Sequence, residues 1–108
     1  VDLNLDKINE FMLVEEIMNS ALNIGPINTV KIVQNSYNIL SVKGVKLNID
    51  GVMTNATINA LNNYKNPLEL FIWIDMNRFS YYGNTSINYM KDWINDRVLI
   101  QVSNYFKK

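Results

Sequence analysis

Two residue types that the chain lacks do most to narrow its chemistry. Neither histidine nor cysteine occurs in the 108 residues. Histidine is the commonest general base and metal ligand, and cysteine supplies thiolate nucleophiles and disulfides. Ser-His-Asp triads, histidine-based zinc sites and disulfide frameworks are therefore excluded, and any catalysis would have to rest on carboxylates.

The carboxylates do not form a pair suited to catalysis. Glu15 and Glu16 are adjacent, so on a helix their side chains point about a quarter-turn apart and do not converge. We expect both on a solvated helix face. Asp92 and Asp96 are four residues apart and lie beside Arg97, a spacing that predicts ordinary surface charge pairing.

The sequence predicts no cofactor, no metal ion, no nucleic-acid partner and no membrane insertion. A calcium loop needs an acid at its first position and a bidentate glutamate at its twelfth, where this chain has Lys46 and Thr57. Ten basic and ten acidic residues cancel, so there is no global attraction to nucleic acid or anionic lipid. The most apolar stretch, residues 68–76, is too short to span a bilayer.

Helical spacing of apolar residues predicts an all-α fold of four to five helices in one domain, residues 1–108. Residues 6–23 form the first helix, and Gly25 and Pro26 then suit the end of one helix and the start of the next. The predicted buried stripe of the first helix is Ile8, Phe11, Val14, Ile17, Met18, Ala21 and Leu22. That of the second helix is Ile27, Val30, Val33 and Tyr37.

The second half of the chain continues this pattern after one interruption. Residues 39–53 alternate only partly and predict a loop or short β-ribbon. Thr54 is the expected N-cap of a short helix through residue 61. Asn66 and Pro67 then begin a helix to about residue 82, whose first half is apolar nearly all round and hence predicted to be central. Ser86 is expected to cap a last helix reaching Phe106.

Several segments follow one another in a recognisable order. They are the Asn23-x-Gly25 turn after a helix, Val33-Gln34 in the next helix, the Asp50-Gly51 turn, a short helix over residues 57–61, an aromatic-rich helix end over residues 77–82, and Trp93-Ile94-Asn95. Over roughly residues 10–100 this order resembles the C-terminal, predicted peptidoglycan-binding region of glycoside hydrolase family 108, which includes secretion activator proteins and phage endolysins. The resemblance implies a lysozyme-like C-terminal lobe.

The chain also departs from that family. Thr54-Asn55 stands where the family usually has Gly-Pro, and Arg97 lies one position later than expected after the tryptophan. The family carries its catalytic glutamate in an N-terminal Glu-Gly-Gly motif, which this chain lacks. No catalytic residue is therefore assigned.

Seven residues are singled out for the site and its turns. The candidate glycan-binding residues are Asn23, Gln34, Tyr81 and Tyr82. The residues expected to shape turns are Gly25, Asp50 and Gly51. The resemblance places Asn23 near a cleft where its amide could bind a sugar, although it could equally end its helix. The tyrosines offer flat apolar faces on which sugar rings stack. Gln34 could instead bridge helix ends.

The leading expectation is a peptidoglycan-associated module of a bacterial or prophage muramidase, inactive alone, whose partner is the glycan strand. No secretory signal is visible, so we expect synthesis in the cytoplasm and action at the cell wall after release. Two alternatives stay open: a glycoside hydrolase using an unrecognised carboxylate, and a helical self-associating protein or prophage remnant. Because the resemblance implies a missing N-terminal lobe, we expect an exposed apolar face and homodimerisation through the first helix.

Overall fold

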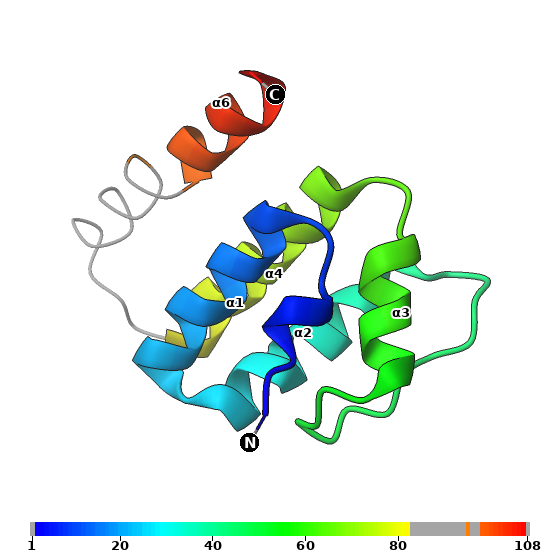
Figure 1. Cartoon of the computed structure of the whole chain (residues 1–108). Coiled ribbons are helices and arrows are strands. Elements are labelled where there is room, and N and C mark those ends of the chain that lie inside the picture. Colours follow the sequence, from blue (N-terminus) through cyan, green and yellow to red (C-terminus); the bar gives the residue numbers. More distant parts are fainter. Residues whose placement is uncertain (1, 83–94, 96–97, 108) are drawn as a thin grey trace.

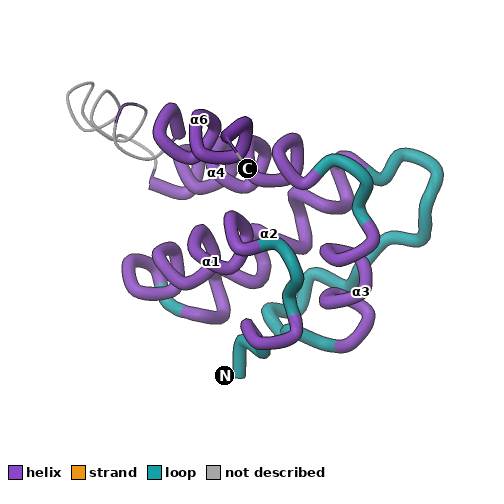
Figure 2. The backbone as a smooth tube through the Cα atoms, turned by 45° about the horizontal axis from the view of Figure 1, so that its top comes forward, coloured by secondary structure: helices purple, strands orange, loops and turns teal. Residues whose placement is uncertain are grey.

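Three long helices build the centre of the molecule, and the remaining elements are arranged around them (Figure 1). The computed structural model describes residues 2–82, 95 and 98–107. Within these residues the fold is all-α, as predicted, and Figure 2 colours every described segment as helix or loop. The elements are η1 (Leu5–Lys7), α1 (Phe11–Ile24), α2 (Pro26–Leu40), α3 (Asn55–Asn63), α4 (Pro67–Tyr82) and α6 (Leu99–Lys107).

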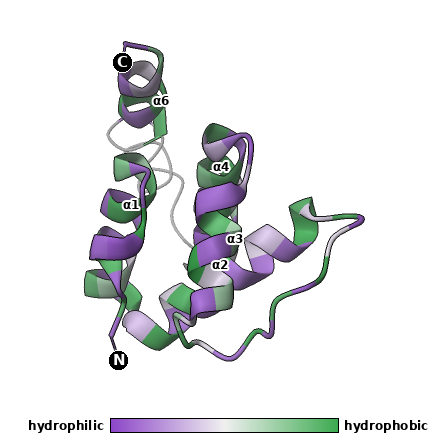
Figure 3. Cartoon of the chain, turned by 45° about the vertical axis from the view of Figure 1, so that its right-hand side comes forward, coloured by the Kyte–Doolittle hydropathy of each residue, from purple (hydrophilic) through white to green (hydrophobic). Residues whose placement is uncertain are grey.

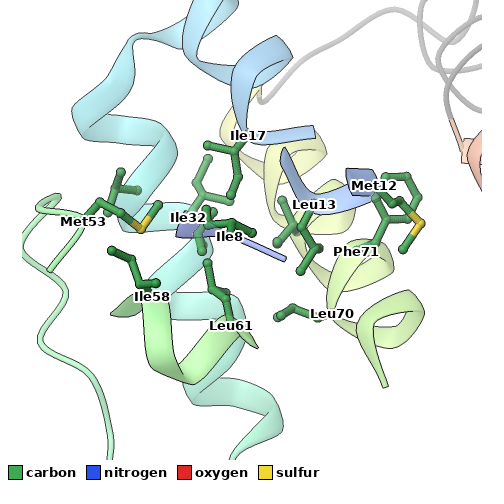
Figure 4. Packing of buried hydrophobic residues seen from close by; sticks show 13 residues of the cluster. Ile8, Met12, Leu13, Ile17, Ile32, Met53, Ile58, Leu61, Leu70 and Phe71 are labelled. Carbon is green, nitrogen blue, oxygen red and sulfur yellow. The ribbon is translucent and has the colours of Figure 1, made fainter. Parts of the chain in front are cut away.

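The core lies between α1, α2 and α4, and α3 closes one side of it (Figure 4). Every described element except η1 and α6 contributes a buried apolar side chain, and two more come from the segments before α1 and before α3. The buried apolar residues are Ile8, Met12, Leu13, Ile17, Val30, Ile32, Val33, Met53, Ile58, Leu61, Leu70, Phe71 and Ile74. Burial of each large side chain is worth about 1.5–3 kcal/mol, so this cluster dominates stability.

The junction between α1 and α2 follows the predicted turn chemistry. Gly25 separates the two helices with φ 88°, a conformation that a side chain would strain, and Pro26 is the first residue of α2. The Gly25 N–H donates to the Ala21 carbonyl at 3.0 Å. The Thr29 hydroxyl spans the bend by donating to the Gly25 carbonyl at 2.8 Å, and it shares a second hydrogen bond with the Ser20 hydroxyl at 2.9 Å.

The first helix starts later than predicted, at Phe11 instead of residue 6. The preceding segment is held to other parts of the fold by asparagine side chains. Asn4 Nδ2 donates to the Met53 carbonyl at 3.0 Å. Asn62 Nδ2 donates to the Lys7 carbonyl at 2.8 Å, and Asn62 Oδ1 accepts from the Asn9 N–H at 2.9 Å. These bonds satisfy backbone groups that a helix would otherwise pair, while Ile8 still reaches the core.

The predicted buried face of α1 is only partly correct, because Ile17 is buried and Val14 packs against the core but other members of the stripe are exposed. Phe11, Met18 and Leu22 are 72%, 49% and 83% exposed. The buried residues of α1 are Met12, Leu13, Glu16, Ile17 and Ser20. Hydropathy changes repeatedly along this helix (Figure 3), so its apolar spacing fits more than one face.

Glu16, expected on a solvated face, is fully buried because a cation from α4 neutralises it. The Arg78 guanidinium pairs with the Glu16 carboxylate, and both side chains are at most 2% exposed. Arg78 also donates to Asn19 Oδ1 at 3.3 Å and lies 3.8 Å from Asp75 Oδ1. A buried charge is tolerated where it is paired and hydrogen-bonded. This pairing joins α1 to α4 inside the core.

The segment over residues 41–54 runs out beside α3 (Figure 1) and contains no strand, so of the two predicted alternatives it is the loop and not the β-ribbon. The Asn38 side chain takes the place of a strand partner. Its amide nitrogen donates to the Leu47 carbonyl at 2.9 Å, and its oxygen accepts from the Leu47 N–H at 2.8 Å. Lys46 Nζ donates to the Asn38 carbonyl at 2.6 Å, near the negative end of α2.

The predicted caps of α3 and α4 are confirmed. Thr54 Oγ1 accepts from the Thr57 N–H at 3.3 Å, and α3 extends slightly beyond its expected end. Asn66 Oδ1 accepts from the Glu69 N–H at 3.2 Å at the start of α4. However, α4 is not buried all round, because Ile72 and Met76 are 36% and 52% exposed.

Only the end of the predicted last helix is described, as α6. The expected cap at Ser86 lies outside the described residues, as do Asp92, Trp93, Asp96 and Arg97. In α6, Val102 and Tyr105 pack against the core, and the Gln101 side chain donates to Glu15 of α1. Glu15 is therefore partly covered by a helix from the far end of the chain.

Candidate functional site

A groove follows α3 along the side that faces the long loop. Its first part has a volume of about 410 Å³ and its second about 380 Å³. The two parts share Tyr37, Ala60 and Asn63, so they form one continuous depression, which we call the α3 groove. Its lining residues are Tyr37, Val45, Lys46, Leu47, Asn48, Asp50, Thr54, Ala56, Thr57, Asn59, Ala60, Asn63, Tyr64, Lys65, Asn66 and Glu69.

Three asparagine side chains line this groove without bonding to the protein. Asn59 and Asn63 lie one turn apart on the same face of α3, and Asn48 comes from the loop. All three are exposed, and none makes a side-chain hydrogen bond within the described part of the chain. Each primary amide offers two donors and one acceptor oxygen. The groove therefore presents both kinds of polar group to a ligand.

Two tyrosines form the aromatic part of the groove. The rings of Tyr37 on α2 and Tyr64 after α3 are 6.2 Å apart between centroids and meet edge-to-face at 75°. The Tyr64 hydroxyl donates to the Glu69 carboxylate. Desolvation, followed by the hydrogen bond to Glu69 and the charge of that carboxylate, raises the pKa of Tyr64 to about 12. The ring is thus fixed at both its edge and its hydroxyl.

Gln34, a predicted glycan-binding residue, lies buried behind the loop and holds it in place. Its Nε2 donates to Asp50 Oδ1 at 3.0 Å, to the Val52 carbonyl at 3.0 Å and to Thr57 Oγ1 at 3.2 Å. Its Oε1 accepts from the N–H groups of Asp50 and Gly51, each at 3.1 Å. Because both ends of the amide are engaged and the residue is 1% exposed, Gln34 positions the groove wall.

Asp50 and Gly51 form the turn that the sequence predicts. The Val52 N–H donates to Asp50 Oδ1 at 3.0 Å, and this bond, followed by the bond from Gln34, lowers the pKa of Asp50. Gly51 has φ 77°, and a Cβ there would lie 2.7 Å from Ile27 Cγ2. Glycine is therefore required by both the backbone and the close approach to α2. This turn sets the depth at which Asp50 lines the groove.

The other predicted site residues lie outside the α3 groove. Asn23 is exposed near the end of α1, where its Nδ2 donates to the Asn19 carbonyl at 3.1 Å. Tyr81 is half-exposed on α4, and its hydroxyl accepts from Asn28 Nδ2 at 3.1 Å. Tyr82 ends α4, and its side chain lies outside the described structure. The structure thus brings together Gln34, Asp50 and Gly51 and leaves the rest apart.

The groove residues absent from the sequence prediction are the three free amides and the tyrosine pair. The sequence does indicate that Asn59 and Asn63 are neighbours, because a spacing of four places them on one helix face. Tyr37 was expected on a buried stripe but is half-buried and lines the groove. Asn48 reaches the groove through the fold of the long loop, and Tyr37 meets Tyr64 through the packing of α2 against the end of α3. No local sequence pattern describes either arrangement.

The carboxylates of the described residues are not arranged as a catalytic or metal site. Glu16 is fully buried with Arg78, and Glu69, near the start of α4, accepts the Tyr64 hydroxyl. No cluster of three potential metal ligands occurs in the described ranges. None of the helices described is long and apolar enough to cross a membrane.

No protein-family model, curated protein or solved structure matches the chain. The basis for a functional proposal is therefore the chemistry of the α3 groove together with the order of motifs in the sequence.

Proposed function

We propose that this domain is a non-catalytic peptidoglycan-binding module that holds a glycan strand in the α3 groove. The observation that carries the proposal is the set of three exposed amides, Asn48, Asn59 and Asn63, beside the Tyr37–Tyr64 pair. Sugar hydroxyls and acetamido groups need both donors and acceptors, which primary amides supply. The apolar face of a sugar ring stacks on an aromatic side chain.

The charges of the groove favour an uncharged sugar backbone over a polyanion. Lys46 and Lys65 are matched by Asp50 and Glu69 among the lining residues. Nucleic-acid binding depends on an excess of basic groups facing the phosphates, and the groove has no such excess. The acetamido groups of the peptidoglycan glycan agree with the amide-rich lining. The ordered resemblance to the C-terminal region of glycoside hydrolase family 108 supports the same polymer.

The proposal assigns binding and not cleavage to this chain. A glycosidase needs one carboxylic acid kept protonated beside the leaving oxygen. Asp50 has a lowered pKa and is ionised at neutral pH, the opposite of that requirement. Glu16 is buried against Arg78, away from any ligand. An enzyme using an unrecognised carboxylate is therefore the less supported alternative.

Retention on purified sacculi tests this function. The parent protein is expected to sediment with sacculi, and the double variant Asn59→Ala/Asn63→Ala to bind at least about tenfold more weakly, since each lost hydrogen bond is worth about 1 kcal/mol. Alanine favours helix, so the variant keeps α3.

The matched control is Asn55→Ala, which alters an exposed amide of α3 that does not line the groove. Equal retention of the double variant and the parent contradicts the assignment of the groove. Parent retention no higher than that of an unrelated helical protein contradicts the function itself.

A second candidate function, self-association through α1, is favoured by one specific observation. Phe11, Met18 and Leu22 lie on one stripe of α1 and are 72%, 49% and 83% exposed. A stripe of large apolar side chains on a helix is a favourable surface for a second copy of the same helix. This interface is distinct from the α3 groove, so the two functions are compatible.

A further inference from the structure

A second hollow lies on another side of α2 from the α3 groove. Its volume is about 370 Å³, and its lining residues are Asn28, Lys31, Ile32, Asn35, Ile49, Asn77, Ser80 and Tyr81. We call it the Tyr81 hollow. Asn35, which lines it, and Tyr37, which lines the groove, are two residues apart and so point to nearly opposite sides of α2. The two depressions are therefore separate surfaces.

The Tyr81 hollow repeats the chemistry of the α3 groove. Tyr81 is 51% exposed, and Asn28 Nδ2 holds its hydroxyl at 3.1 Å while also donating to the Ile24 carbonyl at 3.0 Å. Asn77 Nδ2 donates to Ser36 Oγ at 2.7 Å. The Asn35 amide makes no side-chain hydrogen bond with another described residue. An oriented tyrosine ring thus lies beside asparagine amides, one of them available to a ligand.

The long loop forms the wall shared by the two depressions. Ile49 lines the Tyr81 hollow, whereas its neighbours Asn48 and Asp50 line the α3 groove. Successive residues of an extended segment point to opposite sides, which explains this division. Gln34 fixes the loop by accepting from the Asp50 N–H at 3.1 Å. The two depressions are therefore separated by a loop segment that Gln34 anchors to α2.

We infer that the Tyr81 hollow is a second contact site for the same glycan strand, which crosses the loop at Ile49. The inference rests on the proposed function. A strand long enough to reach both depressions binds the second one at the high effective concentration created by binding the first. A strand too short to reach both occupies the α3 groove alone. Affinity is consequently expected to rise steeply with strand length.

Calorimetric titration of the full chain with β-1,4-linked N-acetylglucosamine oligomers, from dimer to hexamer, tests this inference. Tyr81→Ala and Asn35→Ala are each expected to bind the dimer like the parent and the hexamer about tenfold or more weakly. Asn35 is a surface residue without side-chain bonds to other described residues, so its variant leaves the fold intact if Tyr81→Ala does not. Asn55→Ala, which alters an exposed amide outside both depressions, is the matched control and is expected to bind both oligomers like the parent.

The outcomes separate this inference from the function on which it rests. Equal affinity of the parent for dimer and hexamer, or hexamer binding unchanged in both hollow variants, overturns the second site and leaves groove binding intact. An equal loss in Asn55→Ala overturns the assignment to the hollow. A parent that binds neither oligomers nor sacculi overturns the proposed function and the second site together.

Discussion

Arg78 shows how much a single side chain decides in this small domain. It is 2% exposed and neutralises Glu16 inside the core, while Asn19 accepts one of its further hydrogen bonds. Removing one member of a buried ion pair leaves an uncompensated charge, whereas replacing both members with apolar groups can be neutral or stabilising. The pair therefore specifies how α1 and α4 face each other more than it adds net stability.

We expect Arg78→Met to lower the free energy of unfolding by about 3–5 kcal/mol, because it removes one partner of a buried ion pair and leaves the Glu16 carboxyl buried without it. The double variant Glu16→Leu/Arg78→Met should recover most of that loss. Urea denaturation of Glu16→Leu, Arg78→Met and the double variant measures the coupling free energy between the two side chains. Additive losses would show that the two side chains do not depend on each other.

The raised pKa of the Tyr64 hydroxyl makes the stability of the domain depend on pH in alkaline solution. Its pKa of about 12 lies above the ordinary 10.0, so the folded state keeps the proton after the unfolded state has released it. The stability that this group contributes is fully present below pH 10 and is lost as pH rises towards 12.

Ultraviolet titration is expected to show one late tyrosine that disappears in Tyr64→Phe. Glu69→Gln should lower the pKa of Tyr64 only part of the way, because desolvation remains its largest cause. A late tyrosine that is unaffected by Glu69→Gln would show that the carboxylate does not act on it.

At the level of elements, most helix ends were predictable, whereas the start and the buried face of α1 were not. Gly25-Pro26, Thr54 and Asn66 act through bonds to residues within four positions, so their roles are local. The burial of Glu16 depends on Arg78, 62 residues further along the chain. No window of sequence contains both residues. The absence of a β-ribbon has the same origin, since Asn38 reaches across nine positions to Leu47.

Gly25 and Gly51 differ in how much space surrounds them. Both Gly25 and Gly51 have positive φ, but a Cβ at Gly25 meets nothing within 4 Å, whereas one at Gly51 lies 2.7 Å from Ile27 Cγ2. Gly25→Ala and Gly51→Ala are each expected to lose about 1–3 kcal/mol from backbone strain. Gly51→Ala should lose more because it also meets Ile27.

Thermal unfolding of both variants and of Ile27→Ala/Gly51→Ala checks this expectation. The Ile27 change should relieve part of the Gly51→Ala loss, since the backbone strain remains. The single variant Ile27→Ala gives the cost of the Ile27 change in the parent. If that change costs as much in the Gly51→Ala background as in the parent, the side chain of Ile27 makes no steric contribution to the Gly51→Ala loss.

At the scale of the whole molecule, the all-α class was predictable because apolar residues recur at helical spacing in every long segment. Of the candidate site, only the residues that hold the turn of the loop in place were predictable. Gln34, Asp50 and Gly51 were identified through a turn, whereas Asn48, Asn59 and Tyr64 converge only once the loop has folded against α2 and α3. Binding surfaces assembled from several elements have no single local pattern.

Self-association belongs to this scale as well. If α1 pairs with a second copy, Leu22→Ser should shift the molecule towards monomer, because Leu22 is the most exposed apolar residue of the stripe. Light scattering over a range of concentrations measures the shift, and Val42→Ser, which alters an 81% exposed apolar residue of the loop, is the matched control. A parent that is strictly monomeric at high concentration contradicts pairing through α1.

Gln34 has a consequence for how this domain could change during evolution. Its amide donates from one end and accepts at the other, and both ends hold the same short turn. Glutamate would lose the donors, and methionine would lose the donors and the strong acceptor. Position 34 should therefore tolerate almost no substitution among related chains, and changes at position 50 should accompany any that do occur. In contrast, the groove amides on α3 could diversify freely, so ligand preference could drift while the scaffold beneath it stays constant.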